Sequence, residues 1–182
     1  MRAIETVKTI DVPDGVDVKL EGRVISVKGE KGSITEDFSK ASVTVELEDK
    51  KVVVKANWPR KKEAALVGTI ASHVQNMIKG VTKGYTYKLK IAFAHFPISV
   101  KVKGNMVSIE NFTGERSPRV IKILGDVKVS TKEDDVLVQG INLEDVSQTA
   151  ANIEHATKVR RKDPRVFLDG IFVYEKKEGM ET

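Results

Sequence analysis

The stretch Val16-Asp-Val-Lys-Leu-Glu-Gly22 returns 82 positions later as Ile98-Ser-Val-Lys-Val-Lys-Gly104. Both copies alternate apolar and polar residues, which is the period of a half-buried β-strand, and both end at a glycine that suits a turn. A return strand is expected at Val24–Lys28, and its Ser26 falls on Ser108 of the second copy. The repeated hairpin indicates two copies of one folding unit.

The correspondence extends through both halves of the chain. Val43-Thr-Val-Glu matches Val127-Lys-Val-Ser 84 positions later, and the helical stripe of Val67, Ala71 and Val74 matches one 79 positions later. The separations differ because loops of unequal length connect the elements. We therefore expect an α+β fold of two tandem duplicated domains, residues 1–83 and 84–182, each an antiparallel-rich β-sheet packed against one main α-helix.

Two segments carry apolar residues at the spacing of an amphipathic helix. The first is expected from Pro59 to Lys79, with its stop at Gly80. The second is expected to start at Asn142, where Asn142-Leu-Glu-Asp145 can cap it, and to run into a basic stretch until Asp163-Pro164 breaks it. The apolar run from Val166 to Tyr174 then predicts a final strand pair.

Composition narrows the class of protein. The chain has 31 basic and 26 acidic residues, a net charge of +5 and a pI of about 9.3, which favours a polyanionic partner or good solubility. The absence of cysteine excludes disulfides and thiolate metal sites. Aromatic residues make up only 5% of the chain, which argues against a stacking platform for single-stranded bases. The sequence contains no signal peptide and no membrane-span pattern, so a cytoplasmic protein is expected.

The basic stretch is Lys158-Val-Arg-Arg-Lys-Asp-Pro-Arg165, which holds five basic residues and one acidic residue. Clustered cations on a loop stiffened by proline suit the backbone of a nucleic acid. Cations at a helix C-terminus also interact favourably with the helix dipole, and the charge pattern alone leaves both interpretations open. The candidate phosphate-binding residues are Lys158, Arg160, Arg161, Lys162 and Arg165.

Two further cation clusters are weaker candidates. Arg116 and Arg119 flank a Ser-Pro pair in a predicted loop of the second half, which again suits a phosphate contact. Arg60, Lys61 and Lys62 fall in the first turn of the first predicted helix, where they oppose the helix dipole. A bound phosphate there would also meet free backbone amides, so we count them as possible secondary phosphate contacts. A solubilising surface cluster explains them equally well.

No catalytic or metal-binding pattern emerges. His73, His95 and His155 lack metalloprotease spacing and have no nucleophile-elbow serine nearby, so packing or surface hydrogen bonding is expected for them. Lys28-Gly-Glu-Lys-Gly-Ser33 lacks the spacing of a phosphate-binding loop and precedes a strand, so a simple turn is expected. We predict no catalytic residues, no metal and no cofactor.

Six longer motifs occur in order along the chain: Val27-Lys-Gly-Glu-Lys-Gly32, Ser72-His-Val-Gln-Asn-Met-Ile78, Gly80-Val-Thr-Lys-Gly-Tyr85, Ala94-His-Phe-Pro-Ile98, Asp145-Val-Ser-Gln148 and Lys162-Asp-Pro-Arg165-Val-Phe-Leu-Asp-Gly170-Ile. With these motifs the chain resembles the large-subunit ribosomal protein six family in its archaeal and eukaryotic form. The likeness covers nearly the whole chain. The bacterial branch ends in a Tyr-Lys-Gly-rich tail, which this chain lacks.

The resemblance implies a non-enzymatic structural constituent of the large ribosomal subunit. It implies binding of large-subunit rRNA, mainly through the second domain, near the sarcin–ricin loop and the base of the factor-binding stalk. The implied partners are that rRNA and neighbouring large-subunit ribosomal proteins, with no membrane and no small-molecule substrate. Carried to this chain, it designates the five cations of the basic stretch as RNA-facing, with Arg116 and Arg119 behind them.

Two rival functions belong to other classes. A phosphate-ester enzyme would use the glycine turn and a carboxylate, and it would show metal-dependent turnover. A protein–protein adaptor would dock its basic loop on an acidic partner, and its binding to RNA fragments would be weak. Strongly salt-dependent binding to RNA would separate the preferred function from the adaptor.

Overall fold

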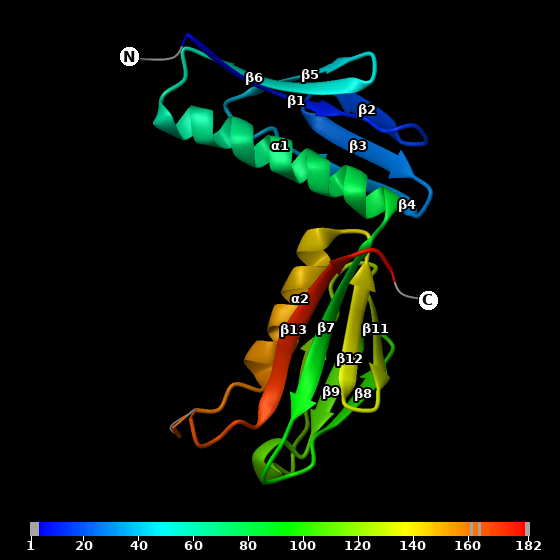
Figure 1. Cartoon of the computed structure of the whole chain (residues 1–182), viewed down its shortest axis with the longest axis vertical. Coiled ribbons are helices and arrows are strands. Elements are labelled where there is room, and N and C mark those ends of the chain that lie inside the picture. Colours follow the sequence, from blue (N-terminus) through cyan, green and yellow to red (C-terminus); the bar gives the residue numbers. More distant parts are fainter. Residues whose placement is uncertain (1–3, 161, 164, 181–182) are drawn as a thin grey trace. The chain divides into compact units, whose positions relative to one another are not determined.

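The computed structural model describes residues 4–160, 162–163 and 165–180. The chain splits into two compact units, Met1–Lys83 and Gly84–Thr182 (Figure 1). Each unit has its own helix and its own sheets, and every strand pair in the described residues is antiparallel. The two units are therefore described one at a time.

The first unit consists of six strands and then one helix. They form two three-stranded sheets, ordered β1-β6-β5 and β2-β3-β4. The elements are β1 (Glu5–Asp11), β2 (Asp17–Glu21), β3 (Val24–Gly29), β4 (Gly32–Asp37), β5 (Thr44–Glu48), β6 (Lys51–Asn57) and α1 (Lys61–Thr82).

Helix α1 packs its apolar stripe against strands of both sheets, with Val67 and Val74 completely buried. It continues past Gly80, so the predicted stop there was wrong. The last turn is held by the β3–β4 turn, because the backbone N–H of Lys31 donates to the carbonyl oxygen of Val81 at 3.0 Å. The helix ends before Gly84, whose φ of +77° is a left-handed value that glycine adopts readily.

The second unit adds one strand to the same plan. Its sheets are ordered β8-β9-β10 and β11-β12-β7-β13. The elements are β7 (Tyr85–Ala92), β8 (Ser99–Lys103), β9 (Met106–Glu110), the 3-10 helix η1 (Phe112–Gly114), β10 (Arg119–Lys122), β11 (Lys128–Lys132), β12 (Asp135–Gly140), α2 (Leu143–Ala156) and β13 (Gly170–Glu178).

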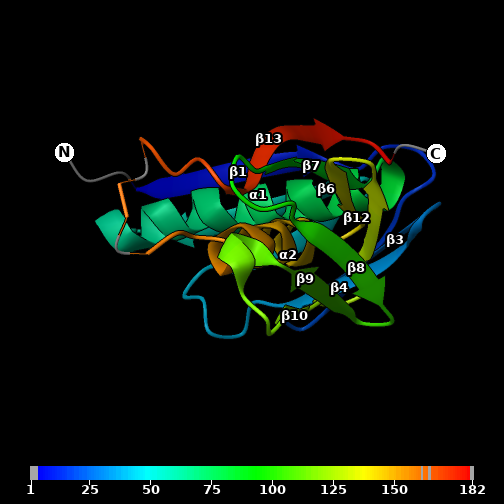
Figure 2. The same ribbon diagram turned by 90° about the horizontal axis from the view of Figure 1, so that it is seen from below.

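The two units share one topology, which confirms the predicted α+β fold of tandem duplicated units. The order β1-β6-β5 has its counterpart in β7-β12-β11, and β2-β3-β4 has its counterpart in β8-β9-β10. Each helix follows the last strand of the shared plan. The structure differs from the expectation in one detail, because each unit holds two small sheets rather than one. Among the described residues, the second unit alone has an extra strand, β13, which lies beside β7 (Figures 1 and 2).

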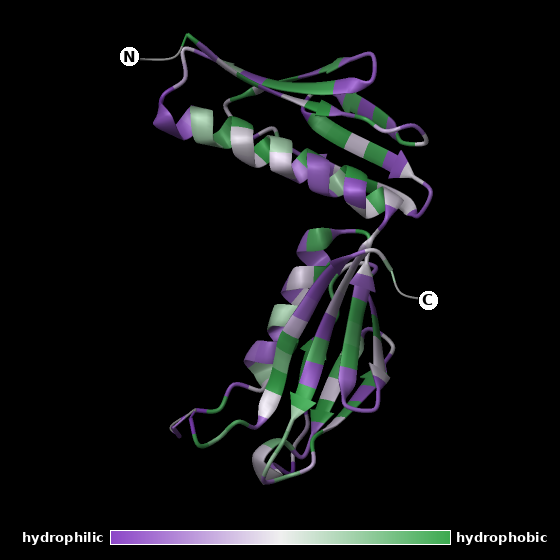
Figure 3. Cartoon of the chain, in the orientation of Figure 1, coloured by the Kyte–Doolittle hydropathy of each residue, from purple (hydrophilic) through white to green (hydrophobic). Residues whose placement is uncertain are grey.

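Alternating side chains explain the core of the second unit. Leu89, Val136 and Val138 point inward from the larger sheet and pack with Val146 and Ile153 of α2. The strands around them show alternating hydrophobic and hydrophilic bands in Figure 3. This is the pattern expected of a sheet that buries one face. The described residues contain no helix that is long and apolar enough to cross a membrane.

Two expectations about the end of the second unit were wrong. Helix α2 begins as predicted, with the side chain of Asn142 accepting from the N–H of Glu144 at 3.0 Å, but it ends at Ala156 rather than near Asp163. In the part of the chain that the structure describes, a loop follows α2 and a single strand, β13, follows that loop. The cause is a long-range bond that no local pattern encodes: the N–H of Ile171 donates to the hydroxyl of Thr157 at 2.9 Å.

We propose that residues 1–83 and 84–182 are domains that fold independently. Each unit has a helix and a buried core of its own, so each fragment should bury enough apolar surface to fold. Fragments 1–83 and 84–182, produced separately, are expected to unfold in single cooperative transitions, measured by circular dichroism during urea titration. A fragment that loses its signal gradually, with no sigmoidal transition, would contradict the proposal for that half.

Candidate nucleic-acid interface

The basic stretch forms the loop between α2 and β13, and we call residues 158–165 the basic loop. The predicted candidates Lys158, Arg160, Lys162 and Arg165 are all exposed on it. Arg161, also predicted, and Pro164 lie outside the described residues. The structure thus brings the described cations of the stretch together on one loop of the second unit.

The basic loop is anchored at its start by Thr157, which is buried and caps α2. The Thr157 hydroxyl donates to the carbonyl oxygen of Glu154 at 3.1 Å and accepts from the N–H of Ile171 at 2.9 Å. One side chain therefore joins the helix end to β13. Because Thr157 is fixed on both sides, Lys158 leaves the helix from a defined position.

Asp169 anchors the segment that follows the basic loop. Its carboxylate is buried, accepts from the backbone N–H of Ala94 and lies 2.7 Å from Nδ1 of His95. Burial works against ionisation of Asp169, but the N–H of Ala94 and the ring of His95 outweigh it and lower the carboxyl pKa. A carboxylate can only accept, so Nδ1 of His95 donates. His95 was predicted to pack or to form a surface hydrogen bond. In the structure it forms a hydrogen bond to Asp169.

Lys162 is held above an aromatic ring. Its ammonium lies 3.9 Å from the ring centroid of Phe167, within the range of a cation–π contact. The Phe167 ring stacks on His95 with centroids 4.4 Å apart, and His95 contacts Asp169. A chain of contacts therefore links Lys162, through the rings of Phe167 and His95, to the buried carboxylate of Asp169.

Arg165 is more exposed but is paired. Its guanidinium lies 3.2 Å from the carboxylate of Asp163, and its backbone N–H donates to the same carboxylate at 3.0 Å. Hydrogen bonds from the side chain and backbone of Arg165 lower the pKa of Asp163. The chain forms a turn after Asp163, because the carbonyl oxygen of Asp163 accepts from the N–H groups of Val166 and Phe167. A phosphate at Arg165 would compete with Asp163.

Lys158, Arg160 and Lys162 form no salt bridge within the described part of the chain. Since α2 ends at Ala156, only Lys158 lies close to its C-terminus. The dipole effect falls off within the last turn of a helix, so it does not account for Arg160 or Lys162. The geometry therefore favours the phosphate interpretation over the dipole interpretation for these two residues.

Arg116 and Arg119, predicted together, have different environments. Arg116 is exposed in the loop before β10. Arg119 begins β10, where its guanidinium bonds both carboxylate oxygens of Glu115 and the carbonyl oxygen of Ala156, and stacks 4.4 Å from the centroid of Phe112. Its donors are largely committed to the fold, so we place Arg119 among structural residues and keep Arg116 as a candidate contact.

Arg60, Lys61 and Lys62 are exposed where α1 begins. Arg60 is the N-cap residue, and its backbone N–H donates to the carboxylate of Glu63 at 2.7 Å. Glu63 therefore offsets part of the unfavourable interaction of the three cations with the helix dipole. The cluster lies in the first unit, apart in sequence from the basic loop.

Comparisons with known proteins identify the family. The pattern of the family described as "Ribosomal protein L6" matches residues 12–84 and 96–170, one segment in each unit. This chain belongs to the ribosomal protein L6 family. A protein of Desulfurococcus amylolyticus named "Large ribosomal subunit protein uL6" is 48% identical over 98% of this chain and 99% of its own length. Proteins of the same name from Aeropyrum pernix and Staphylothermus marinus are 50% and 52% identical, over 95% and 91% of this chain and 96% and 92% of their own.

Membership of the L6 family confirms the predicted resemblance and its archaeal character, since these relatives are archaeal. The L6 family is structural and non-enzymatic, which sets aside the phosphate-ester enzyme. The glycine segment Gly29–Gly32 is the hairpin turn between β3 and β4, as predicted. The second family match ends at residue 170, so it includes the basic loop.

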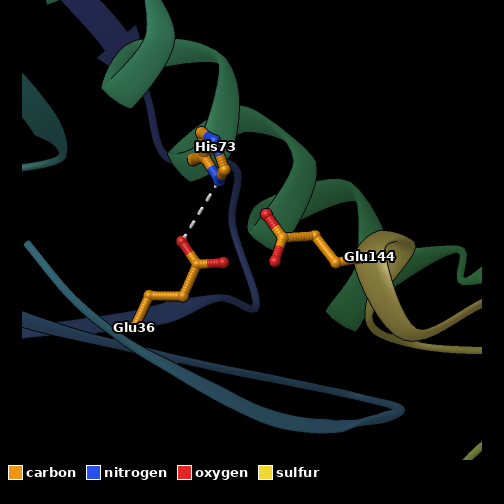
Figure 4. Close-up of side chains that lie close together, drawn as sticks. All are labelled: Glu36, His73 and Glu144. Atoms are coloured by element: carbon orange, nitrogen blue, oxygen red, sulfur yellow. Dashed lines mark ion pairs between the residues drawn. The ribbon is translucent and has the colours of Figure 1, made fainter. Parts of the chain in front are cut away.

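The other two histidines are on the helices. His73 of α1 lies 3.6 Å from the carboxylate of Glu36 (Figure 4), and its ring packs edge-on against that of Phe38. The third side chain drawn in Figure 4, Glu144, belongs to α2. His155 lies exposed in the last turn of α2, and its carbonyl oxygen accepts from the N–H of Lys158. His73 therefore packs and contacts a carboxylate, and His155 contributes its backbone carbonyl to the end of α2.

The exposure of aromatic rings was not foreseen from composition. Five of the ten aromatic residues are exposed, and four of these lie in the second unit. Phe172 lines a cavity of about 540 Å³ with Lys158, Lys162 and Leu168. The low aromatic content therefore does not exclude contacts between rings and bases, because scarcity in the chain says nothing about burial. The four exposed rings of the second unit are Phe93, Phe96, Phe172 and Tyr174.

Asp169→Asn tests the anchor of the basic loop. The amide keeps the shape but loses the charge that Ala94 and His95 bond, so unfolding is expected to become easier by about 1–3 kcal/mol near pH 7. The lowered pKa makes this stabilisation complete above the unfolded value of about 3.9, and it fades as pH falls through the folded value. The difference in melting temperature from the wild type should therefore shrink in acid.

Asp163→Asn is the matched control, because Asp163 is solvent-accessible and pairs only locally with Arg165. Its stability is expected to stay within about 0.5 kcal/mol of the wild type. Thermal unfolding of both variants across the pH range measures the contrast. Equal stability losses in the two variants would show that Asp169 is not a special anchor.

Proposed function

We propose that this L6-family chain is a structural protein of the large ribosomal subunit that binds large-subunit rRNA through its basic loop. Support for assembly in the subunit comes from its relatives, which carry the name "Large ribosomal subunit protein uL6". Its working location is then the ribosome in the cytoplasm, among neighbouring large-subunit proteins. The resemblance to the family also implies a site near the sarcin–ricin loop and the base of the factor-binding stalk.

One observation carries the proposal: a loop held at both ends presents three exposed cations that form no salt bridge with any residue that the structure describes. Thr157 holds the start of the segment and Asp169 holds its end. Lys158, Arg160 and Lys162 stand exposed between these anchors. Because the segment is anchored at both ends, its cations should lose less conformational freedom when phosphates bind than cations on an unanchored loop, which favours a contact that is specific in position as well as favourable in charge.

Such a loop suits folded RNA rather than a particular base sequence. Side chains cannot read the deep, narrow major groove of A-form RNA, so shape and backbone contacts are expected. Lys158, Arg160 and Lys162 would contact closely spaced phosphates and lower the repulsion between them. The exposed Phe172 and Leu168 beside Lys158 and Lys162 offer apolar contact with an unstacked base or a sugar.

We assign the remaining predicted cations a smaller share of the RNA contact. Arg165 and Arg161 belong to the same stretch, although Arg165 already bonds Asp163. Arg116 lies exposed ahead of β10 and supplies a further contact. Arg60, Lys61 and Lys62 are secondary phosphate contacts from the first unit. Arg119 is left out because its guanidinium bonds Glu115 and Ala156.

The combined change Lys158→Ala, Arg160→Ala and Lys162→Ala tests the function directly. Each lost phosphate contact should flatten the salt dependence by about 0.7–0.9 in log–log slope, so the loss of all three should change the slope by about 2.1–2.7. Affinity for a transcript of the sarcin–ricin region should fall at least tenfold at low salt. Filter binding across a salt series measures both quantities, and the melting temperature should change little.

The matched control is Lys122→Ala, Lys128→Ala and Lys132→Ala, which removes the same charge from exposed positions on β10 and β11. Its RNA affinity should stay within about threefold of the wild type, or about 0.7 kcal/mol. Equal losses in the two triple variants would mean that net charge matters and the basic loop does not. Unchanged RNA binding in the loop variant would favour the adaptor function.

A further inference from the structure

The duplicated units differ at one sheet edge. Strand β7 is the counterpart of β1, since each pairs with the last strand of the shared plan, β12 and β6 respectively. The other side of β7 is covered by β13, which runs antiparallel to it from Gly170 to Glu178. Strand β1 is the last strand of its sheet in the described residues. The edge that is paired in one unit is thus open in the other.

The register aligns the two edges residue by residue. Lys8 lies opposite Val54, and Tyr87 lies opposite Val138. Val54 and Val138 are 84 positions apart, the separation found for the neighbouring strands, so Lys8 and Tyr87 correspond. The residues of β1 that correspond to Thr86, Lys88 and Lys90, which face β13, are Val7, Thr9 and Asp11.

The backbone groups of β1 point toward the open edge at alternate residues. Trp58 donates to the carbonyl oxygen of Ile4 at 2.7 Å, and the N–H of Val12 donates to Lys50 at 2.8 Å. Hydrogen-bonded pairs alternate along an antiparallel ladder, so even-numbered residues of β1 bond β6. Val7 and Thr9 therefore direct their N–H and carbonyl groups away from β6. Such a row of groups is a template for another strand.

A groove of about 570 Å³ lies between this edge and one face of α1. Its floor is apolar, because Ala71 and Ile78 of α1 are buried there beside the half-buried Ile10. Ser72 and Gln75 are exposed along its wall. The groove can therefore accept both a backbone, along β1, and inward-facing apolar side chains, above α1.

The second unit shows what fills the equivalent space. At the separation of 79 that relates the helices, Ala71 and Ile78 correspond to Ala150 and Thr157. Thr157 accepts the N–H of Ile171 in β13. The helix face that lines the groove in the first unit therefore corresponds to the face that contacts a strand in the second.

We propose that the open edge of β1 binds an extended segment of another polypeptide, which adds antiparallel to β1 in the groove beside α1. Strand addition of this kind draws affinity from main-chain hydrogen bonds and specificity from alternate side chains. The helix-facing residues Ile171 and Val173 of β13 lie opposite Ile91 and Leu89. The incoming segment accordingly places apolar residues at two alternate positions, opposite Val12 and Ile10.

Charge defines a further position of the segment. The side chain of Lys8 faces α1. Its ammonium lies 3.9 Å from the position that a Cβ atom would take on Gly68 of that helix. In β13 the corresponding position opposite Tyr87 is Lys176, a cation over an aromatic ring. Beside Lys8 a cation would be repelled, so the segment carries an acidic residue there. Lys8 also protects the edge from pairing with unsuitable strands, as edge lysines do.

The test uses the full chain and a synthetic peptide of residues 170–178 that carries Lys176→Glu. Amide hydrogen exchange, followed by NMR, reports each residue separately. The peptide is expected to slow exchange at Val7 and Thr9, and the unmodified peptide is expected to bind more weakly. The peptide could instead displace the chain's own β13 from β7. That outcome would change amide exchange at β7 and not at β1, so the two outcomes can be told apart.

Thr9→Pro removes an N–H that faces the open edge and leaves the bonds to β6 in place. It should weaken the peptide at least tenfold, whereas Thr9→Ala, which keeps the N–H, should stay within twofold. Ser72→Arg, which narrows the groove from α1 and changes no residue of the strand, should also weaken it at least tenfold. Peptide at millimolar concentration that protects no β1 amide, or that binds all variants alike, overturns the proposal. Protection of the same amides by a single-stranded RNA decamer, and not by the peptide, also overturns it.

Discussion

The pairing of β13 with the free edge of β7 determines most of what distinguishes the second unit. To reach that edge, the chain must leave α2 early and cross to the far side of β7. The bond from the N–H of Ile171 to Thr157 fixes the departure at the end of the helix. The crossing segment is the basic loop. Its position is therefore set by sheet pairing as well as by the helix from which it emerges.

The same constraint bears on the cations, because the segment that carries them is anchored at both ends. A surface loop joined only by its ends would leave long side chains mobile and would weaken phosphate binding through lost entropy. Here Asp169 bonds Ala94 and His95, and the ring of His95 stacks on Phe167 beneath Lys162. Among the described residues, the unit without β13 has no such loop. The unit with β13 therefore carries a basic loop, and the other unit has an open strand edge.

The sequence was informative wherever structure is local or periodic. The repeated hairpin near Val16 and Ile98, the cap at Asn142 and the turn at Gly29 follow from short-range patterns, and the fold class follows from their repetition. The end of α2 could not be predicted, because a contact fourteen residues away decides it. The end of α1 was predicted wrongly for a similar reason. The carbonyl oxygen of Val81 accepts from the N–H of Lys31, which is distant in the sequence.

The candidate site was predictable in outline and not in detail. A cation cluster is visible in any sequence, but its pairing depends on neighbours in space. Glu115 lies only four residues before Arg119, so their ion pair could have been suspected from the sequence. The bond from Arg119 to the carbonyl oxygen of Ala156 could not, because it depends on the fold. The roles of His95 and Asp169 depend on two loops 74 residues apart, and no local pattern brings them together.

Amine labelling of the assembled particle measures the central claim most directly. Purified large subunits and the free chain are treated with the same acetylating reagent, and the modified lysines are quantified by mass spectrometry. Lys158 and Lys162 should react at least tenfold more slowly in the subunit, and nuclease digestion of the RNA should restore their reactivity. Equal reactivity of Lys158 and Lys162 in the free chain and in the subunit would contradict binding of rRNA by the basic loop.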